Sequence, residues 1–185
     1  DIKLRFAKES VAEVEKAAAL LMKTLKAGGK VMIFGNGGSA ADAQHVAAEF
    51  VNRYVVERKA LAALALSTDS SLLTSIPNDS SFDNVFSRQV EALGHKGDIV
   101  WGFTTSGKSP NVVKAFQTAK SQWRKCIAFT GQDVSKVEKL VDCCVSVPSK
   151  STPRIQELHI TLAHIVSALV AESVPVKEQT AKKEP

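Results

Sequence analysis

Residues 31–50, VMIFGNGGSAADAQHVAAEF, combine a strand-length apolar run, a glycine-rich loop and the start of a helix. The apolar run at 31–34 predicts a buried strand, and the glycines within 35–38 let the backbone turn sharply and approach a ligand without side-chain clashes. Ser39 is expected to cap the following helix, whose free N–H groups and dipole favour a bound phosphate. The stretch therefore predicts a strand, a phosphate loop and a helix in direct succession.

Strand-length apolar runs recur along the chain, with helical segments between them. The runs are residues 31–34, 61–66, 99–103, 126–129 and 144–147. An amphipathic pattern over 2–27 predicts one long N-terminal helix, and Pro153 suits the start of a last helix over 153–172. The alternation predicts one α/β domain over residues 1–174, with five parallel strands covered by helices on both faces. Residues 175–185 are rich in Lys, Glu and Pro, and we expect them to be disordered.

Composition narrows the class of protein. The chain has 185 residues, 44% of them hydrophobic, a formal charge of +5 and three cysteines. This length can bury a core without disulfides, and the cysteines lack the spacing of zinc ligands. No apolar run reaches the ~18 residues of a membrane span, and the basic residues are scattered rather than clustered. We therefore expect a soluble cytoplasmic protein that binds neither membrane nor nucleic acid.

The first loop also fits the pattern G-x-G-x-x-A over residues 35–40, so dinucleotide binding is an alternative. A dinucleotide site needs an acidic residue about 20 positions further on. The nearest candidate, Asp69, lies well beyond that spacing. A tight turn that binds nothing is the other alternative, and we favour a phosphate ligand over both.

A second loop, TTSGKSP at residues 104–110, directly follows the strand expected at 99–103. It offers hydroxyl groups, backbone donors and a helix start at Ser109, with Pro110 at the first helical position. Loops at the carboxyl ends of parallel strands are where open α/β sheets bind ligands. Lys108 could neutralise a phosphate there, or it could be a solvated surface lysine.

His45 and Glu49 are four residues apart and so project from one face of the first predicted helix. They could be a surface ion pair, or His45 could be a packed structural histidine. A second polar cluster, Gln156, His159 and His164, gives weight to a metal or acid–base role. On a regular helix the two later histidines point about 140° apart, so one of them should be structural. Gln156 and His164 lie about 12 Å apart along the axis, too far for one metal ion. Either the helix breaks after Gln156, or the two residues reach one site from different protomers, which we favour.

The motifs GNGGSAADAQH, PNDSSF, TTSGKS and RIQELH with its following histidine make the chain resemble the sugar isomerase (SIS) domain family up to about Val174. The resemblance implies a flavodoxin-like three-layer sandwich. It also implies an aldose–ketose isomerase that converts sedoheptulose 7-phosphate to D-glycero-D-manno-heptose 7-phosphate. This is the first step toward ADP-heptose for the lipopolysaccharide of the bacterial cell envelope. A homotetramer with active sites at subunit interfaces is implied as well.

The resemblance also implies roles for individual residues. The substrate-binding residues would be Asn36, Gly37, Gly38, Ser39, Glu49, Asn78, Asp79, Thr104, Thr105, Ser106, Ser109 and Gln156. The ligands of a zinc ion would be His45, Glu49, Gln156 and His164. Glu49 and His164 would also form the catalytic acid–base pair, which leaves His159 as the structural histidine. Where the family commonly has serine, Thr104 keeps the hydroxyl group.

Two other functions remain within the resemblance. Closely similar SIS proteins bind the bacterial replication initiator DnaA and lack the catalytic glutamate, which this chain keeps as Glu49. A regulator that senses phosphosugars is the third possibility. No segment suggests the helix-turn-helix that such a regulator would use to bind DNA.

Overall fold

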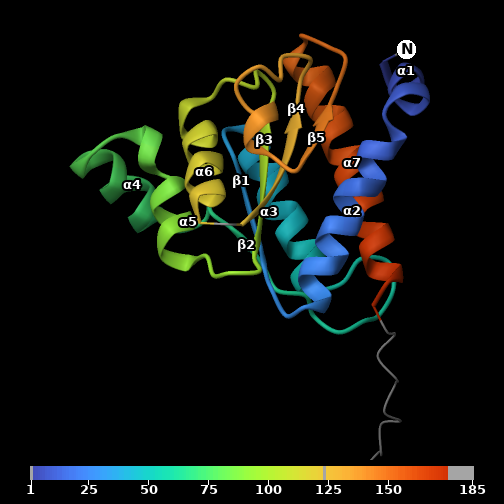
Figure 1. Ribbon diagram of the computed structural model, residues 1–185, viewed down its shortest axis with the longest axis horizontal. Helices are drawn as coiled ribbons and strands as arrows, with labels where there is room; N and C mark the ends of the chain where they lie inside the picture. The colour runs from blue at the N-terminus through green and yellow to red at the C-terminus, as the bar shows by residue number, and fades with distance from the viewer. Residues whose placement is uncertain (1, 123, 175–185) are drawn as a thin grey trace, which may run out of the picture.

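The computed structural model describes residues 2–122 and 124–174, which form a parallel sheet between two layers of helices (Figure 1). The strands are β1 (Val31–Gly35), β2 (Ala63–Ala65), β3 (Ile99–Thr104), β4 (Lys125–Thr130) and β5 (Cys143–Ser146). Their order is β2-β1-β3-β4-β5, and every neighbouring pair is parallel. The predicted α/β sandwich is confirmed. The tail expected to be disordered, residues 175–185, lies outside the described residues.

Helices cover both faces of the sheet. They are α1 (Ile2–Glu9), α2 (Val11–Lys26), α3 (Gly38–Val51), α4 (Ser70–Asp79), α5 (Ser87–Leu93), α6 (Pro110–Ser121) and α7 (Thr152–Glu172), with 3-10 turns η1 (Phe82–Asn84) and η2 (Glu138–Leu140). Helices α2, α3 and α7 pack on one face, and α5 and α6 pack on the other (Figure 1). None of the helices formed by the described residues combines the length and the hydrophobicity of a membrane span.

Strand β1 shows why the central strands are apolar throughout. All five of its residues are buried. Because successive side chains of a strand point to opposite faces, Val31 and Ile33 enter the core beneath α2, α3 and α7, whereas Met32 and Phe34 enter the core beneath α5 and α6. A sheet covered on both sides thus requires a continuous apolar run, which the sequence displays.

The N-terminal helix differs from its prediction because it is two helices. Ser10 has φ −137° and ψ 20°, outside the helical region, so α1 ends before it and α2 begins after it. Serine competes for backbone hydrogen bonds and is more at home at helix ends than in helix interiors. Phe6 of α1 and Val14 of α2 are nevertheless buried in the same core.

The strand order creates a switch point between β1 and β3. From β1 the chain passes through α3, on one face, to the edge strand β2. From β3 it passes through α6, on the opposite face, to β4. The loops that follow these two neighbouring strands therefore diverge and leave a crevice at the carboxyl end of the sheet. Both loops predicted to bind phosphate lie at this crevice.

Candidate functional site

A pocket of about 250 Å³, here called the loop pocket, opens between the loops that follow β1 and β3. It is lined by Asn36, Gly37, Gly38, Ser39, Phe103, Thr104, Thr105, Ser109, Thr152 and Gln156. None of these lining residues is charged. Helices α3, α6 and α7 all begin at the pocket. The first N–H groups of a helix lack acceptors within it and carry the positive end of its dipole, so the pocket suits an anion such as phosphate.

The backbone of the first loop favours glycine at Gly37, whose φ of 55° is one that residues with a side chain rarely adopt. Gly38 lies against Gln156, since a Cβ there would be 2.6 Å from Nε2 of that flexible side chain, which would have to move aside. Gly37 rather than Ser39 is the N-cap of α3. The prediction that Ser39 caps this helix is therefore wrong: the positive φ turns the chain into the helix earlier, and Ser39 is buried in the first turn.

Thr104, Thr105 and Ser109 of the second loop line the pocket, whereas Ser106, also predicted to bind substrate, does not. Thr104 Oγ1 lies 3.3 Å from Ser109 Oγ and 3.5 Å from Ser106 Oγ. Pro110 begins α6, as predicted. Lys108 does not line the pocket, because its Nζ pairs with Asp133 Oδ2 at 2.6 Å on the surface, and this pairing lowers the pKa of Asp133. The second loop therefore offers neutral donors rather than a charge.

A reciprocal pair of amides joins the two loops. Asn36 Nδ2 donates to Asn111 Oδ1 at 2.9 Å, and Asn111 Nδ2 donates to Asn36 Oδ1 at 2.8 Å. The Asn36 side chain thus ties the loop after β1 to the start of α6 at the pocket. Asn111 was missed in the sequence because its partner is 75 residues away and no motif includes it.

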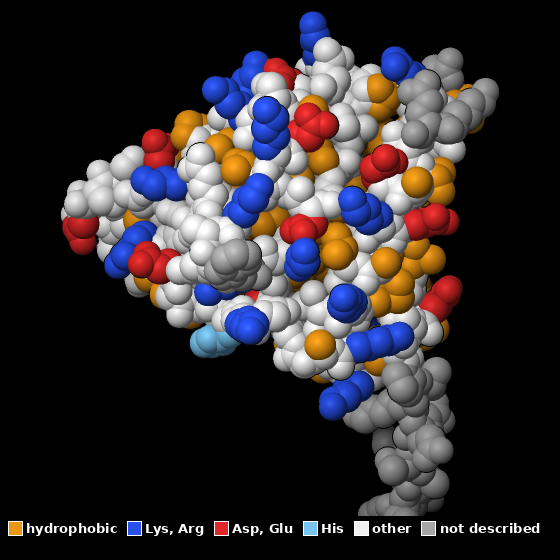
Figure 2. Space-filling model, viewed as in Figure 1, with side chains coloured by type: hydrophobic (Ala, Val, Ile, Leu, Met, Phe, Trp, Pro, Cys, Tyr) orange, Lys and Arg blue, Asp and Glu red, His pale blue; other side chains and the backbone are white. Residues whose placement is uncertain are grey.

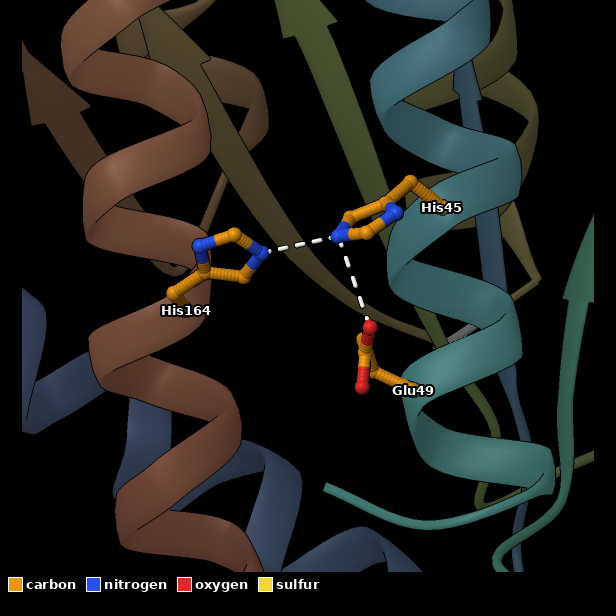
Figure 3. Close-up of side chains that lie close together, drawn as sticks. All are labelled: His45, Glu49 and His164. Atoms are coloured by element: carbon orange, nitrogen blue, oxygen red, sulfur yellow. Dashed lines mark hydrogen bonds and ion pairs between the residues drawn. The ribbon is translucent and has the colours of Figure 1, made fainter. Parts of the chain in front are cut away.

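His45, Glu49 and His164 form a second polar group, the His–Glu–His cluster, between α3 and α7 (Figure 3). His45 Nε2 lies 2.8 Å from His164 Nε2 and 3.4 Å from Glu49 Oε1. One ligand atom from each residue lies within 4.8 Å of the others. Two imidazoles and a carboxylate form a set of three ligands that zinc accepts, with a fourth position left for substrate or water.

Asp42 is a further residue of this region that the sequence analysis missed. It precedes His45 by three residues on α3, and its Oδ2 is buried with no hydrogen-bond partner among the described residues. Burial raises the pKa of Asp42, and the nearby His45 lowers it. Metal-binding histidines commonly donate their second N–H to a carboxylate, and the i, i+3 spacing was the available signal.

Helix α7 is continuous, which excludes a break after Gln156. The Gln156 side chain lies against Gly38 and lines the loop pocket, whereas His164 meets His45. Within one chain, Gln156 therefore belongs to the loop pocket and His164 to the neighbouring His–Glu–His cluster. The distance between the two residues does not require a second protomer. Gln156 is not brought to the His–Glu–His cluster here, so the ligand set of four remains a prediction.

The Asn–Asp pair lies away from the loop pocket within this chain. Asn78 and Asp79 end α4, on the outer side of the molecule (Figure 1). Both are exposed, and Asn78 Nδ2 donates to Asp79 Oδ1 at 2.8 Å. Neither residue lines the pocket, so their role in substrate binding stays a prediction.

His159 has the surroundings of a structural residue. It is fully buried, and its Nε2 lies 3.1 Å from the carbonyl oxygen of Thr130 at the end of β4. Burial lowers the pKa of His159 to about 4, so the ring is neutral near pH 7 and donates its N–H to that carbonyl. The side chain thereby joins α7 to the sheet.

Comparison with known proteins gives consistent matches. The SIS domain family model matches residues 1–131. A phosphoheptose isomerase of Thermodesulfovibrio yellowstonii is 50% identical over 182 residues, which cover 98% of this chain and 90% of the relative. Solved structures of phosphoheptose isomerases from Neisseria gonorrhoeae and Francisella tularensis each cover 92% of this chain, and 91% of each solved chain is covered. Their TM-scores are 0.87 and 0.89, at 43% and 33% identity.

Proposed function

The chain belongs to the SIS domain family, and we propose that it is an aldose–ketose isomerase that converts sedoheptulose 7-phosphate to D-glycero-D-manno-heptose 7-phosphate. This is the activity class named for relatives about 50% identical to it. The reaction moves a carbonyl group between two adjacent carbons at one end of the sugar, while the phosphate is at the other end. An enzyme for it needs an anion site and an acid–base site held apart.

The spacing of the loop pocket and the His–Glu–His cluster is the observation that carries this proposal. Gly38 and Gln156 meet at the pocket, and His45 and His164 meet at the cluster. These contacts are seven residues apart on α3 and eight on α7, or about 10–12 Å at 1.5 Å per residue. An extended heptose phosphate has a comparable reach. Phosphate bound in the pocket would therefore place the reacting carbons at the cluster.

Two side chains of the cluster suit the proton transfers. In the ketose-to-aldose direction, a base removes a proton from C1, the electron pair forms an enediol, and a proton then returns at C2. We assign the carbon-bound proton to the carboxylate of Glu49 and the oxygen-bound protons to the imidazole of His164. A positioned acid or base of this kind contributes about 10²–10⁴-fold to the rate.

A zinc ion is part of the proposal, and the donors of the cluster fit one. His45, Glu49 and His164 would hold the ion, which when bound supplies a Lewis acid that polarises the substrate carbonyl. A carboxylate that binds a metal tightly is a weaker base, so Glu49 would divide between the two roles. Addition and removal of a chelator, with zinc content measured alongside turnover, would test its contribution.

Assembly into a homo-oligomer is also proposed. An apolar groove lies between α1, α2 and α7, lined by Phe6, Ala7, Val11, Val14, Leu158, Thr161, Leu162 and Ile165. Val11 and Ile165 are 50% and 44% exposed. Figure 2 shows hydrophobic side chains, with Asp and Glu among them, on the side of the molecule where α1, α2 and α7 lie. A second copy of the chain would cover the groove. Light scattering should then give the mass of an oligomer, and the mass of a monomer would contradict the proposal.

The decisive experiment is isomerisation of sedoheptulose 7-phosphate in D2O, followed by NMR. We expect deuterium at C2 of the aldose product, because the proton held by the base exchanges with solvent. Unphosphorylated sedoheptulose is the matched control and should react poorly. Failure of the purified chain to isomerise the phosphorylated sugar would favour the alternative of binding DnaA. A product without deuterium, together with turnover that Glu49→Gln leaves unchanged, would remove the acid–base assignment.

A further inference from the structure

The segment between α3 and β2 carries an aromatic ring onto the His–Glu–His cluster. Tyr54 stacks on His164, with ring centroids 5.6 Å apart and an interplanar angle of 27°. The separation is within the range of an offset stack. His164 also meets the His45 ring, with centroids 5.0 Å apart and an interplanar angle of 66°. The imidazole therefore contacts two rings: it lies at hydrogen-bond distance from His45, and Tyr54 stacks on its face.

The backbone next to Tyr54 is strained. Among the described residues, Val55 is the only non-glycine with a positive φ, 59°. The amide of Val56 donates to the carbonyl of Tyr54 at 2.6 Å, which closes a three-residue γ-turn around Val55. A β-branched residue at positive φ costs roughly 1–3 kcal/mol. The Val55 side chain is 78% exposed, so its own packing does not explain the turn.

Arg58 holds the far end of the same segment. Its side chain is buried, and Nη2 donates to the carbonyl of Glu49 at 2.6 Å, while Nη1 donates to the carbonyl of Phe50 at 2.9 Å. These carbonyls belong to the last turn of α3, where a cation also interacts well with the helix dipole. The amide of Leu61 donates to the carbonyl of Phe50 at 3.0 Å as well. The segment is thus a short loop closed on the end of the helix that carries Glu49.

We propose that Tyr54 is a positioning residue that fixes the plane of the His164 imidazole, and that the turn at Val55 and the Arg58 clamp hold its ring in place. This role rests on the proposed isomerase function of His164. The ring acts through its face, because a stacked imidazole cannot rotate about its Cβ–Cγ bond without losing the contact. A loosely held imidazole would meet the oxygens of the substrate less often in a productive geometry, which lowers kcat more than it raises KM.

The aromatic ring and the hydroxyl group can be separated by substitution. We expect Tyr54→Phe, which keeps the face, to stay within about 2-fold of the wild-type kcat. Tyr54→Leu, which keeps an apolar side chain without the face, should lower kcat by about 10-fold or more at nearly unchanged KM and melting temperature. A wild-type kcat for Tyr54→Leu, an equal loss in both variants, or a loss that appears only with a lowered melting temperature would each overturn the proposal.

The contact itself can be measured without activity, because Tyr54 is the only tyrosine of the chain. Protein labelled with 3-fluorotyrosine should give one ¹⁹F resonance, which His164→Gln should shift. His95→Gln, at an exposed histidine, is the matched control and should leave the resonance in place. A resonance that does not respond to His164→Gln would overturn the proposal. A wild-type chain inactive on phosphosugars would instead remove the proposed function, and a responsive resonance would then still establish the ring contact.

Discussion

The loop pocket and the His–Glu–His cluster both include residues of α3 and α7 but are built in different ways. The pocket consists largely of backbone and neutral side chains at the starts of three helices. The cluster consists of three titratable side chains, and His164 is 119 residues from His45 in the chain. The fold itself supplies the anion site, whereas individual side chains supply the chemistry. Substitutions in the cluster should therefore act on kcat, and substitutions in the pocket should act on substrate affinity.

The largest effect is expected from Glu49→Gln. The substitution keeps the size of the side chain but removes the base, so kcat should fall by at least about 100-fold at unchanged melting temperature. Glu157→Gln is the matched control, since Glu157 is an exposed carboxylate on α7 that pairs with Arg154. Steady-state kinetics of both variants checks the difference. Turnover near the wild-type value in Glu49→Gln would mean that the cluster is not the acid–base site.

A smaller effect, on affinity instead of turnover, is expected from Ser109→Ala in the loop pocket. Loss of a hydrogen bond to a charged phosphate should weaken phosphorylated ligands by about 1–3 kcal/mol. The control is Ser121→Ala at the opposite end of α6, where the hydroxyl donates to the carbonyl of Thr118. Calorimetric titration with sedoheptulose 7-phosphate measures both variants. Unchanged affinity, or equal weakening toward the unphosphorylated sugar, would place the phosphate elsewhere.

The smallest effect is expected at His159, which lies on α7 between Gln156 of the loop pocket and His164 of the cluster. We expect this residue to stabilise the fold and to take no part in catalysis. Its pKa of about 4 in the folded protein is below the usual value of 6.5, so the unfolded chain binds more protons between these values. Its contribution to stability should decline as the pH falls through this window, by roughly 1 kcal/mol per pH unit. His159→Gln should show a flatter dependence in denaturant titrations, with kcat at pH 7 within a few-fold of wild type. A parallel pH dependence in both proteins would show that His159 does not titrate this way.

The sequence predicted the sheet well and the contacts between distant elements poorly. The five apolar runs match the strands to within two residues, because a strand covered on both faces must be apolar throughout. The loop pocket was predictable because each of its main loops is one contiguous motif. The break at Ser10 was not, since the amphipathic pattern continues across it.

Distant partners account for the other misses. Asn111 and Tyr54 owe their importance to Asn36 and His164, and no local pattern signals such pairs. The axial distance between Gln156 and His164 was predicted correctly from the helical rise. The explanation favoured from the sequence, that the two residues reach one site from different protomers, is not required by that distance. The chain places the two residues in adjacent regions along one continuous helix.

The reciprocal hydrogen bonds between Asn36 and Asn111 bear on how fast the pocket can fill. Each amide already has its partner before a ligand arrives, so the two loops are joined in the free protein. Binding then needs little ordering of the backbone, and less conformational entropy is lost when the phosphate docks. Association should therefore be limited by diffusion and by release of water, rather than by rearrangement of the loops.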